Sequence, residues 1–270
     1  YRRLTLRDDL KRTGVPLFLC MAAFAHSVIM SWRKWGDLMV DAGREMELPA
    51  RMAEGAVLYV DVRNLYGPLP AYLNATLFRL FGIHADVLIG AGLVSAAAMG
   101  ITLYALARRF LDPLPSAIVV MTFFYSCAFA HLTPNAAFNF VLPSSYAATY
   151  GMLAASASLL FLVRHIQTEK DGSLVLSLLF GALAFFSKIE ASFAVACAHL
   201  VHSVGAVWLR RMGTRRVLAY GCAVAGVAGV YGLLYLKVGP GLWNDNILAA
   251  TGSLSSGAGR PILGYASWSM

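Results

Sequence analysis

A cluster of acidic side chains lies in a polar stretch of this sequence, residues 33–86, which follows a long apolar run. Its members are Asp37, Asp41, Glu45, Glu47, Glu54 and Asp61. Asp41 and Glu45 are four residues apart, so their side chains share a face if the segment is helical. A positioned carboxylate can act as a general base that takes the proton of an attacking hydroxyl group. This stretch is therefore the part of the chain in which we expect chemistry.

The composition indicates that the rest of the chain spans a membrane. Of the 270 residues, 59% are hydrophobic and 13% are charged, whereas globular domains carry roughly 25% charged residues. The apolar residues form runs near the length of about 20 residues that crosses a bilayer. These runs are residues 15–32, 87–107, 115–130, 146–163, 173–187, 189–209 and 217–236. We predict an all-α polytopic integral membrane protein with about seven transmembrane helices and amphipathic interfacial helices in its first outer loop.

The chain is expected to form one module that is incomplete. Its first apolar run exceeds the roughly 7–15 residues of a signal-peptide core, and no small-residue cleavage site follows it. The sequence opens at Tyr1 and stops at Met270 without a closing element. We therefore expect residues 1–270 to be a single transmembrane module from a longer protein, with residues 33–86 as its first extracytoplasmic loop.

The distribution of charge predicts the orientation in the membrane. If the N-terminus is cytoplasmic, the formal net charge of +8 falls entirely on the cytoplasmic segments, as the positive-inside rule requires. The basic residues sit in short turns between apolar runs, which excludes nucleic acid as a partner. We predict a bacterial inner (plasma) membrane protein whose working site faces away from the cytoplasm.

Local signals in the first loop predict two helices. Residues 41–54 are expected to form a short helix that begins at Asp41 and stops before Gly55. Pro49 is expected to bend this helix or to split it. Residues 66–70 predict a rigid turn. Residues 71–81 predict an amphipathic helix whose apolar stripe holds Leu73, Leu77, Phe78 and Phe81.

Several residues of the loop also follow the motif of a known family. Asp41 is followed by Arg44-Glu45-Met46, by Gly55 fourteen residues after the aspartate, and by Tyr66-Gly67-Pro68-Leu69. The order of these residues after a first membrane span resembles the motif of the lipid-phosphosugar-dependent glycosyltransferases of the GT-C fold (glycosyltransferase family 39). That family includes protein O-mannosyltransferases, aminoarabinose lipid A transferases and rhizobial lipopolysaccharide core transferases. The motif departs from the family where Ala42 replaces a common Glu and Tyr66-Gly67 replaces Lys-Pro.

The resemblance implies a hexosyl- or pentosyltransferase built on part of a GT-C module. Its donor would be a polyprenyl-phosphate-linked sugar, and its acceptor a hydroxyl group of a lipid, glycan or protein. Asp41 would be the general base, with Asp61 as a helper that assists the base or orients the acceptor. The alternative for Asp41 is an N-cap on a surface helix.

The donor's phosphate requires cationic partners at headgroup depth. The candidates for binding substrate are Arg44, Glu45, Arg63, Tyr66, His131, Lys188 and Glu190. Lys188 and Glu190 lie in a Ser-Lys-Ile-Glu turn that resembles a Thr-Lys segment of the family. The alternatives are that these ionisable side chains snorkel to the membrane surface, and that Arg44 pairs with Glu45 or Glu47.

No cofactor is expected from the sequence, although Asp41 and Asp61 leave a divalent cation open. His199 and His202 lie three residues apart without a third ligand in view, so we expect them to hydrogen-bond between helices. Two other functions remain open: a non-enzymatic transporter or flippase of lipid-linked sugars, and a structural subunit of an envelope complex. A transporter predicts polar residues that line a path through the spans.

Overall fold

The computed structural model of this chain describes residues 6–32, 34, 41–130, 139–209 and 213–245, and these confirm the expected all-α fold. The helices are α1 Leu6–Ser31, α2 Asp41–Ala53, α3 Pro68–Phe81, α4 Ala85–Ala107, α5 Pro113–Phe123, α6 Tyr146–Thr168, α7 Asp171–Ser187, α8 Ile189–Trp208, α9 Thr214–Val238 and α10 Gly241–Trp243. A π-helical turn, η1 (Phe124–Ala128), continues α5. Every apolar run predicted as a span therefore forms a helix.

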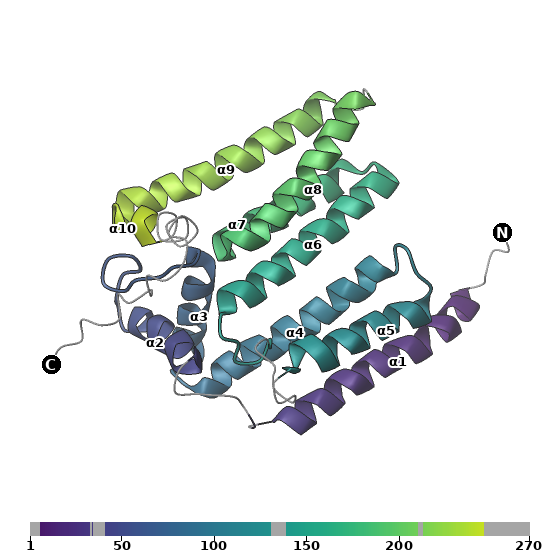
Figure 1. The fold of residues 1–270 in the computed structure, drawn as a ribbon, viewed down its shortest axis with the longest axis horizontal. Coiled ribbons are helices and arrows are strands. Elements are labelled where there is room, and N and C mark those ends of the chain that lie inside the picture. The colour runs from purple at the N-terminus through teal and green to yellow at the C-terminus, as the bar shows by residue number, and fades with distance from the viewer. Residues whose placement is uncertain (1–5, 33, 35–40, 131–138, 210–212, 246–270) are drawn as a thin grey trace, which may run out of the picture.

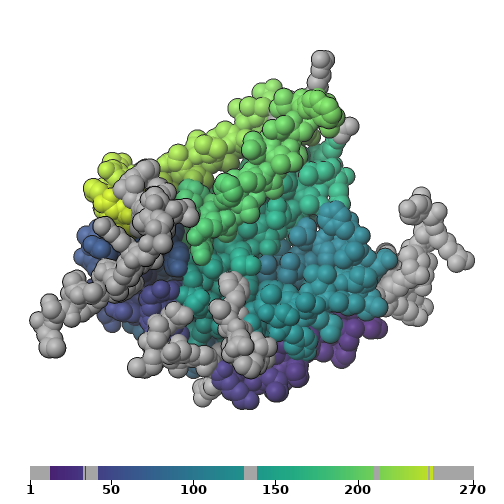
Figure 2. All heavy atoms as spheres, in the orientation of Figure 1, coloured from purple at the N-terminus to yellow at the C-terminus, as the bar shows by residue number. Residues whose placement is uncertain are grey.

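The long helices pack side by side in an order that differs from their order in the chain. From one edge, α1 packs on α5, α5 on α4, α4 on α6 and α6 on α7 (Figure 1). Helix α8 packs on both α6 and α7, and α9 forms the other edge against α7. Figure 2 shows the same order as bands of atoms, from α1 at the lower edge to α9 at the upper edge.

Five helices in the described part of the chain are long and apolar enough to cross a membrane. They are Thr13–Ser31 of α1, and α4, α6, α8 and α9 in full. The other two predicted spans form shorter apolar helices, Pro113–Ala128 and Asp171–Ser187. The structure thus supports a membrane protein, and the count of seven spans stays a prediction.

The turns between the long helices gather at the two ends of the bundle. Helices α2, α3 and α10 lie at one end, which we call the loop end (Figure 1). The α4–α5 and α6–α7 connections, the end of α8 and the start of α9 lie at the other end, which we call the basic end because it carries Arg108, Arg109, Arg215 and Arg216. Gln167 at the end of α6 donates a hydrogen bond to the carbonyl of Arg109 at 3.4 Å, which ties two of these connections together.

Helix α2 follows its sequence signals closely. It begins at Asp41 and ends at Ala53, and Gly55 has φ +115, which favours glycine. The N–H groups of Gly55 and Ala56 bond to the carbonyls of Met52 and Arg51, as in a Schellman motif. The alternative that Pro49 splits the helix is wrong, because α2 continues through this residue.

Helix α3 differs from its prediction in start and in buried face. It begins at Pro68, so the turn expected at residues 66–70 is partly its first helical turn. Only Phe78 of the predicted stripe is fully buried, together with Ala71, Asn74 and Ala75. Leu73 and Phe81 are exposed, because α3 packs across the ends of α4, α6 and α7 with its other face.

Candidate functional site

The first loop has a hydrophobic core of its own at the loop end. Met52 of α2, Leu58 and Val62 of the following turn, and Ala71 and Ala75 of α3 are all buried in it. Val238 and Leu242, from the end of α9 and from α10, complete this core. The part of the loop from α2 to α3 is therefore packed around this core and against α9 and α10.

Asp61 stabilises the turn between α2 and α3. Its Oδ2 accepts a hydrogen bond from the N–H of Val57 at 2.7 Å, and its own N–H bonds to the Val57 carbonyl at 2.9 Å. Arg51 of α2 donates to the Asp61 carbonyl at 3.4 Å. Asp61, the predicted catalytic helper, is exposed. One of its carboxylate oxygens is already bonded to the N–H of Val57.

Tyr59 and Asn64 fix the backbone of the segment that leads into α3. The Tyr59 hydroxyl donates to the carbonyl of Tyr66 at 2.7 Å, and the Asn64 amide donates to the same carbonyl at 3.1 Å. Burial raises the pKa of Tyr59 well above its ordinary value, so this hydroxyl keeps its proton and remains a donor. These bonds hold Tyr66 in place at the loop end.

Tyr66 and Lys188, two predicted site residues, lie together although they are far apart in the sequence. The Lys188 Nζ lies 5.2 Å from the centroid of the Tyr66 ring, a cation–π contact. The next residue, Gly67, donates its N–H to the Ser187 carbonyl at 3.1 Å. A side chain at Gly67 would overlap the Phe186 carbonyl, so glycine permits this close approach. The first loop is thereby docked on the α7–α8 turn.

Arg44 and Glu45 also lie together, on α2, and both bind the start of α6. Glu45 Oε2 accepts the N–H of Tyr146 at 2.8 Å, and Arg44 Nη2 donates to the Ser144 carbonyl at 2.7 Å. The two side chains form an ion pair at 3.5 Å. A carboxylate is favoured at a helix N-terminus, where N–H groups lack partners within the helix. These predicted substrate-binding residues therefore join the first loop to α6.

The remaining predicted residues are placed less fully. Asp41 begins α2, but its side chain lies outside the described part of the structure, and His131 lies outside it altogether. Arg63 is exposed beside the Asp61 turn, and Glu190 is exposed in the first turn of α8. Asp41, Arg63 and Glu190 all belong to segments at the loop end.

Two structural contacts of this region escaped the sequence analysis. Arg79 of α3 donates to the Met52 carbonyl at 2.6 Å and to the Ala53 carbonyl at 3.4 Å, which caps the end of α2. Asn74 is buried in α3 and accepts a hydrogen bond from the Tyr150 hydroxyl of α6 at 2.7 Å. The signal in the sequence that could have indicated these contacts is the presence of Asn74 and Arg79 within a mostly apolar helix.

His199 and His202 of α8 form hydrogen bonds between helices, as predicted. Ser158 of α6 and Ser177 of α7 each donate a hydroxyl proton to the other's carbonyl at 2.7 Å. Their oxygens are therefore free to accept from His199 Nε2, which lies 3.4 and 3.1 Å away. Nδ1 atoms of both histidines lie 3.1 Å from the Tyr220 hydroxyl of α9. The cluster joins four helices, as polar residues in membrane bundles commonly do.

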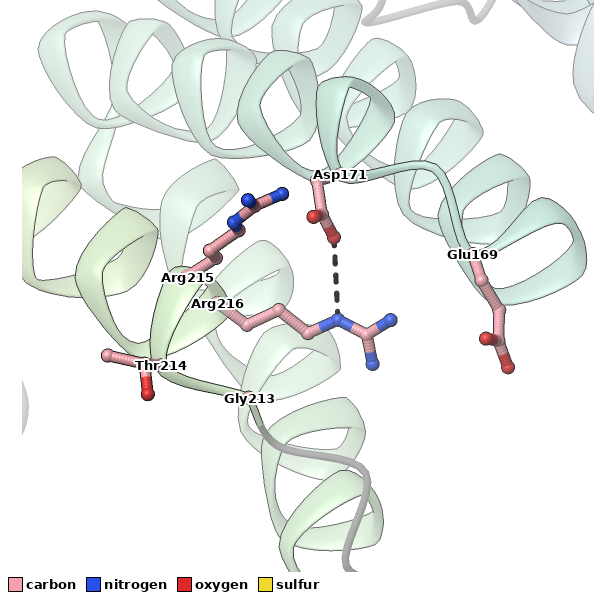
Figure 3. A pocket seen from close by; sticks show the side chains of 6 residues that line it. All are labelled: Glu169, Asp171, Gly213, Thr214, Arg215 and Arg216. Carbon is pink, nitrogen blue, oxygen red and sulfur yellow. Dashed lines mark ion pairs between the residues drawn. The ribbon is translucent and has the colours of Figure 1, made fainter.

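A pocket of about 460 Å³ lies at the basic end, far from the first loop. It is lined by Glu169, Asp171, Gly213, Thr214, Arg215 and Arg216. Figure 3 shows Arg216 reaching from the start of α9 toward Asp171 at the start of α7, with 3.5 Å between Nε and Oδ1. The lining carries both acidic and basic side chains. The ion pair between Arg216 and Asp171 joins the start of α9 to the start of α7.

Comparison with known protein families, with curated proteins and with solved structures finds no match to this chain. The described residues contain no group of three or more His, Cys, Asp or Glu side chains arranged to hold a metal ion.

Proposed function

We propose that this chain is an integral-membrane glycosyltransferase of the GT-C type. It transfers a sugar from a polyprenyl-phosphate donor to a hydroxyl group of a lipid, glycan or protein at the extracytoplasmic face. Asp41 takes the proton of the acceptor hydroxyl while the oxygen of that hydroxyl forms a bond to the anomeric carbon of the sugar. The bond from that carbon to the phosphate oxygen breaks, and polyprenyl phosphate leaves. In the bacterial inner membrane, the N-terminus and the basic end face the cytoplasm.

The observation that carries this proposal is the fixed position of the first loop. Gly67 bonds to Ser187 of the α7–α8 turn, and Glu45 bonds to Tyr146 at the start of α6. These contacts hold an acidic loop at one end of a bundle of apolar helices, which is where a membrane surface would lie. Catalysis between a lipid-linked donor and a polar acceptor requires such fixed positions at the interface.

Lys188 is the cation best placed to hold the donor's phosphate. It is half-buried at the loop end, and its ammonium group faces the ring of Tyr66. Arg44 is occupied by the Ser144 carbonyl and Glu45, whereas Arg63 is an exposed second candidate. Lys188 of the α7–α8 turn supplies a positive charge in place of the lysine of the family's Lys-Pro segment, where this chain has Tyr66-Gly67.

The polar groups within the long helices favour a transferase over a transporter. His199, Tyr220, Ser158 and Ser177 bond to one another, so they join helices instead of lining a path for a polar substrate. A structural envelope subunit predicts no activity and no dependence on Asp41.

The test is transfer of labelled sugar by the protein in membranes, with a panel of polyprenyl-phosphate sugars and, in parallel, nucleotide sugars. We expect transfer from a polyprenyl-phosphate sugar and none from nucleotide sugars when the membranes lack polyprenyl phosphate. Absence of transfer from every donor, with folded protein, would overturn the proposal in favour of a transporter or a structural subunit.

A further inference from the structure

The pocket at the basic end has two walls of opposite charge. Its volume of about 460 Å³ lies within the range of about 300–1,000 Å³ that small-molecule sites occupy. Arg215 and Arg216 extend into it from the start of α9 (Figure 3). Glu169 and Asp171 line it from the turn between α6 and α7. The charged side chains of the lining therefore carry no net charge, but their two signs come from different elements.

The wall formed by α9 offers groups that bind a phosphate. Arg215 is exposed, and its side chain has no hydrogen-bond or ion-pair partner within the described part of the chain. Guanidinium N–H groups form strong, often bidentate hydrogen bonds to phosphate oxygens. Thr214 adds a hydroxyl to the same wall, and this hydroxyl can donate a further bond. This wall can thus take up an anion through Arg215 while Arg216 stays paired with Asp171.

The wall formed by the α6–α7 turn offers carboxylates. Asp171 is still 49% exposed although its Oδ1 lies 3.5 Å from Arg216 Nε. Glu169 lines the same wall and is exposed at the end of α6. A carboxylate accepts hydrogen bonds from an ammonium group and repels another anion. A ligand with negative charge alone is therefore disfavoured here, and a ligand that carries both charges is favoured.

The pocket lies where two candidate spans end. Helix α9 is a candidate span from its first residue, Thr214, and the span formed by α6 ends one residue before Glu169. Val217 and Leu218, directly after Arg216, are 56% and 61% exposed. Apolar surface that hydrocarbon would cover in a membrane thus begins beside the pocket. A lipid with its headgroup in the pocket can lay its acyl chains along α9.

We propose that this pocket binds the headgroup of an aminophospholipid, in which a phosphate is joined to a primary ammonium group, as in phosphatidylethanolamine. The phosphate lies at Arg215 and Thr214, and the ammonium group donates its N–H groups to Glu169 and Asp171. Phosphatidylglycerol has no cation for the acidic wall, and the quaternary ammonium of phosphatidylcholine has no N–H to donate. The site lies at the end of the bundle opposite the first loop and does not depend on sugar transfer.

The test measures lipid binding to the purified chain in detergent by native mass spectrometry. The probes are phosphatidylethanolamine, phosphatidylcholine and phosphatidylglycerol with the same acyl chains. We expect phosphatidylethanolamine to bind wild type at least about fivefold more tightly than the other two. Arg215→Gln should weaken its binding about tenfold, the effect of one hydrogen bond to a charged group. Arg164→Gln removes the same charge from an exposed position on α6 outside the pocket and should leave binding unchanged.

A second pair of variants tests the acidic wall. Glu169→Gln keeps the size of the side chain and removes its charge, so phosphatidylethanolamine should lose its advantage over phosphatidylcholine. Asp112→Asn is the control, because Asp112 is exposed at the α4–α5 connection of the same end and lies outside the pocket. This control should keep the wild-type preference between the two lipids.

Several results would overturn the inference. Equal affinity of wild type for the three lipids, or tighter binding of phosphatidylglycerol, would mean that the acidic wall selects nothing. Equal weakening by Arg215→Gln and Arg164→Gln would mean a diffuse basic surface instead of a pocket. Displacement of phosphatidylethanolamine by inorganic phosphate as effectively as by glycerophosphoethanolamine would mean a site for a free anion.

Discussion

The carboxylate of Glu45 accepts a hydrogen bond from the backbone N–H of Tyr146, a residue 101 positions farther along the chain, at 2.8 Å. Tyr146 is the first residue of α6, and Ser145 before it accepts a further bond from Ala148. The side chain of Glu45 is 14% exposed, so its charge acts on the helix end with little screening by water. This contact ties the acidic first loop to the helical bundle.

Glu45→Ala is expected to destabilise the protein by about 1–2 kcal/mol, because it leaves the N–H of Tyr146 without its acceptor at a helix terminus. Thermal unfolding in detergent measures this as a lower midpoint. Glu47→Ala is the control, since Glu47 is exposed and meets Arg51 only at 3.9 Å. That control is expected within about 0.5 kcal/mol of wild type. Equal effects of the two changes would contradict the role given to Glu45.

Gly67→Ala is expected to loosen the first loop from the α7–α8 turn, because an added Cβ would overlap the Phe186 carbonyl. The backbone at Gly67 has φ −60 and tolerates alanine, so the effect comes from contact alone. Limited proteolysis of the loop measures it, with faster cleavage expected.

Gly213→Ala is the matched control for Gly67→Ala. Gly213 also precedes a helix with extended backbone, and an added Cβ there meets nothing within 4 Å. Cleavage of the Gly67→Ala protein at the wild-type rate would mean that the loop is not held by this turn.

Tyr59→Phe is expected to cost about 1 kcal/mol near neutral pH, through loss of the hydrogen bond to Tyr66. Since burial raises the pKa of Tyr59, the folded protein keeps a proton that the unfolded chain releases above a pH of about 10. This stability is present below that pH and is lost as the pH rises. The difference between wild type and Tyr59→Phe should shrink in alkaline unfolding experiments. A constant difference up to high pH would rule out the buried, protonated hydroxyl.

Tyr220→Phe is expected to lower the stability of the bundle by about 0.6–1.7 kcal/mol, the range for hydrogen bonds between membrane helices. The change removes the hydroxyl that lies 3.1 Å from both His199 and His202. Tyr235→Phe on the exposed side of the same helix serves as the control. Unfolding in mixed detergents measures both, and equal midpoints for the two variants would contradict the bridging role.

Much of the fold could be predicted because it depends on local sequence. Apolar run length predicted each long helix, and Gly55 predicted where α2 stops, since both signals act within a few residues. The pairing of His199 with other helices was predictable from its place in an apolar span. The buried face of α3 was not predictable, because Asn74 is buried through a hydrogen bond from Tyr150, which lies on a helix distant in the sequence.

The contacts of the predicted site residues were harder to foresee than the helices that carry them. The pairing of Arg44 with Glu45 was one of the expected alternatives and is present at 3.5 Å, whereas the contacts of both side chains with residues 144–146 were not foreseen. Nothing local to Tyr66 indicates that Lys188 lies above its ring. Such contacts arise from how the loop folds back on the bundle, which residue spacing within the loop does not encode.

The most direct test of the transferase is the rate of sugar transfer from a polyprenyl-phosphate donor by Asp41→Asn and by Asp37→Asn, both checked for wild-type unfolding midpoints. Each change replaces one carboxylate of the same loop by an amide. The proposed base predicts a loss of roughly 100-fold or more for Asp41→Asn and a rate near wild type for Asp37→Asn. Transfer by Asp41→Asn at the wild-type rate would contradict the assignment of Asp41 as the base.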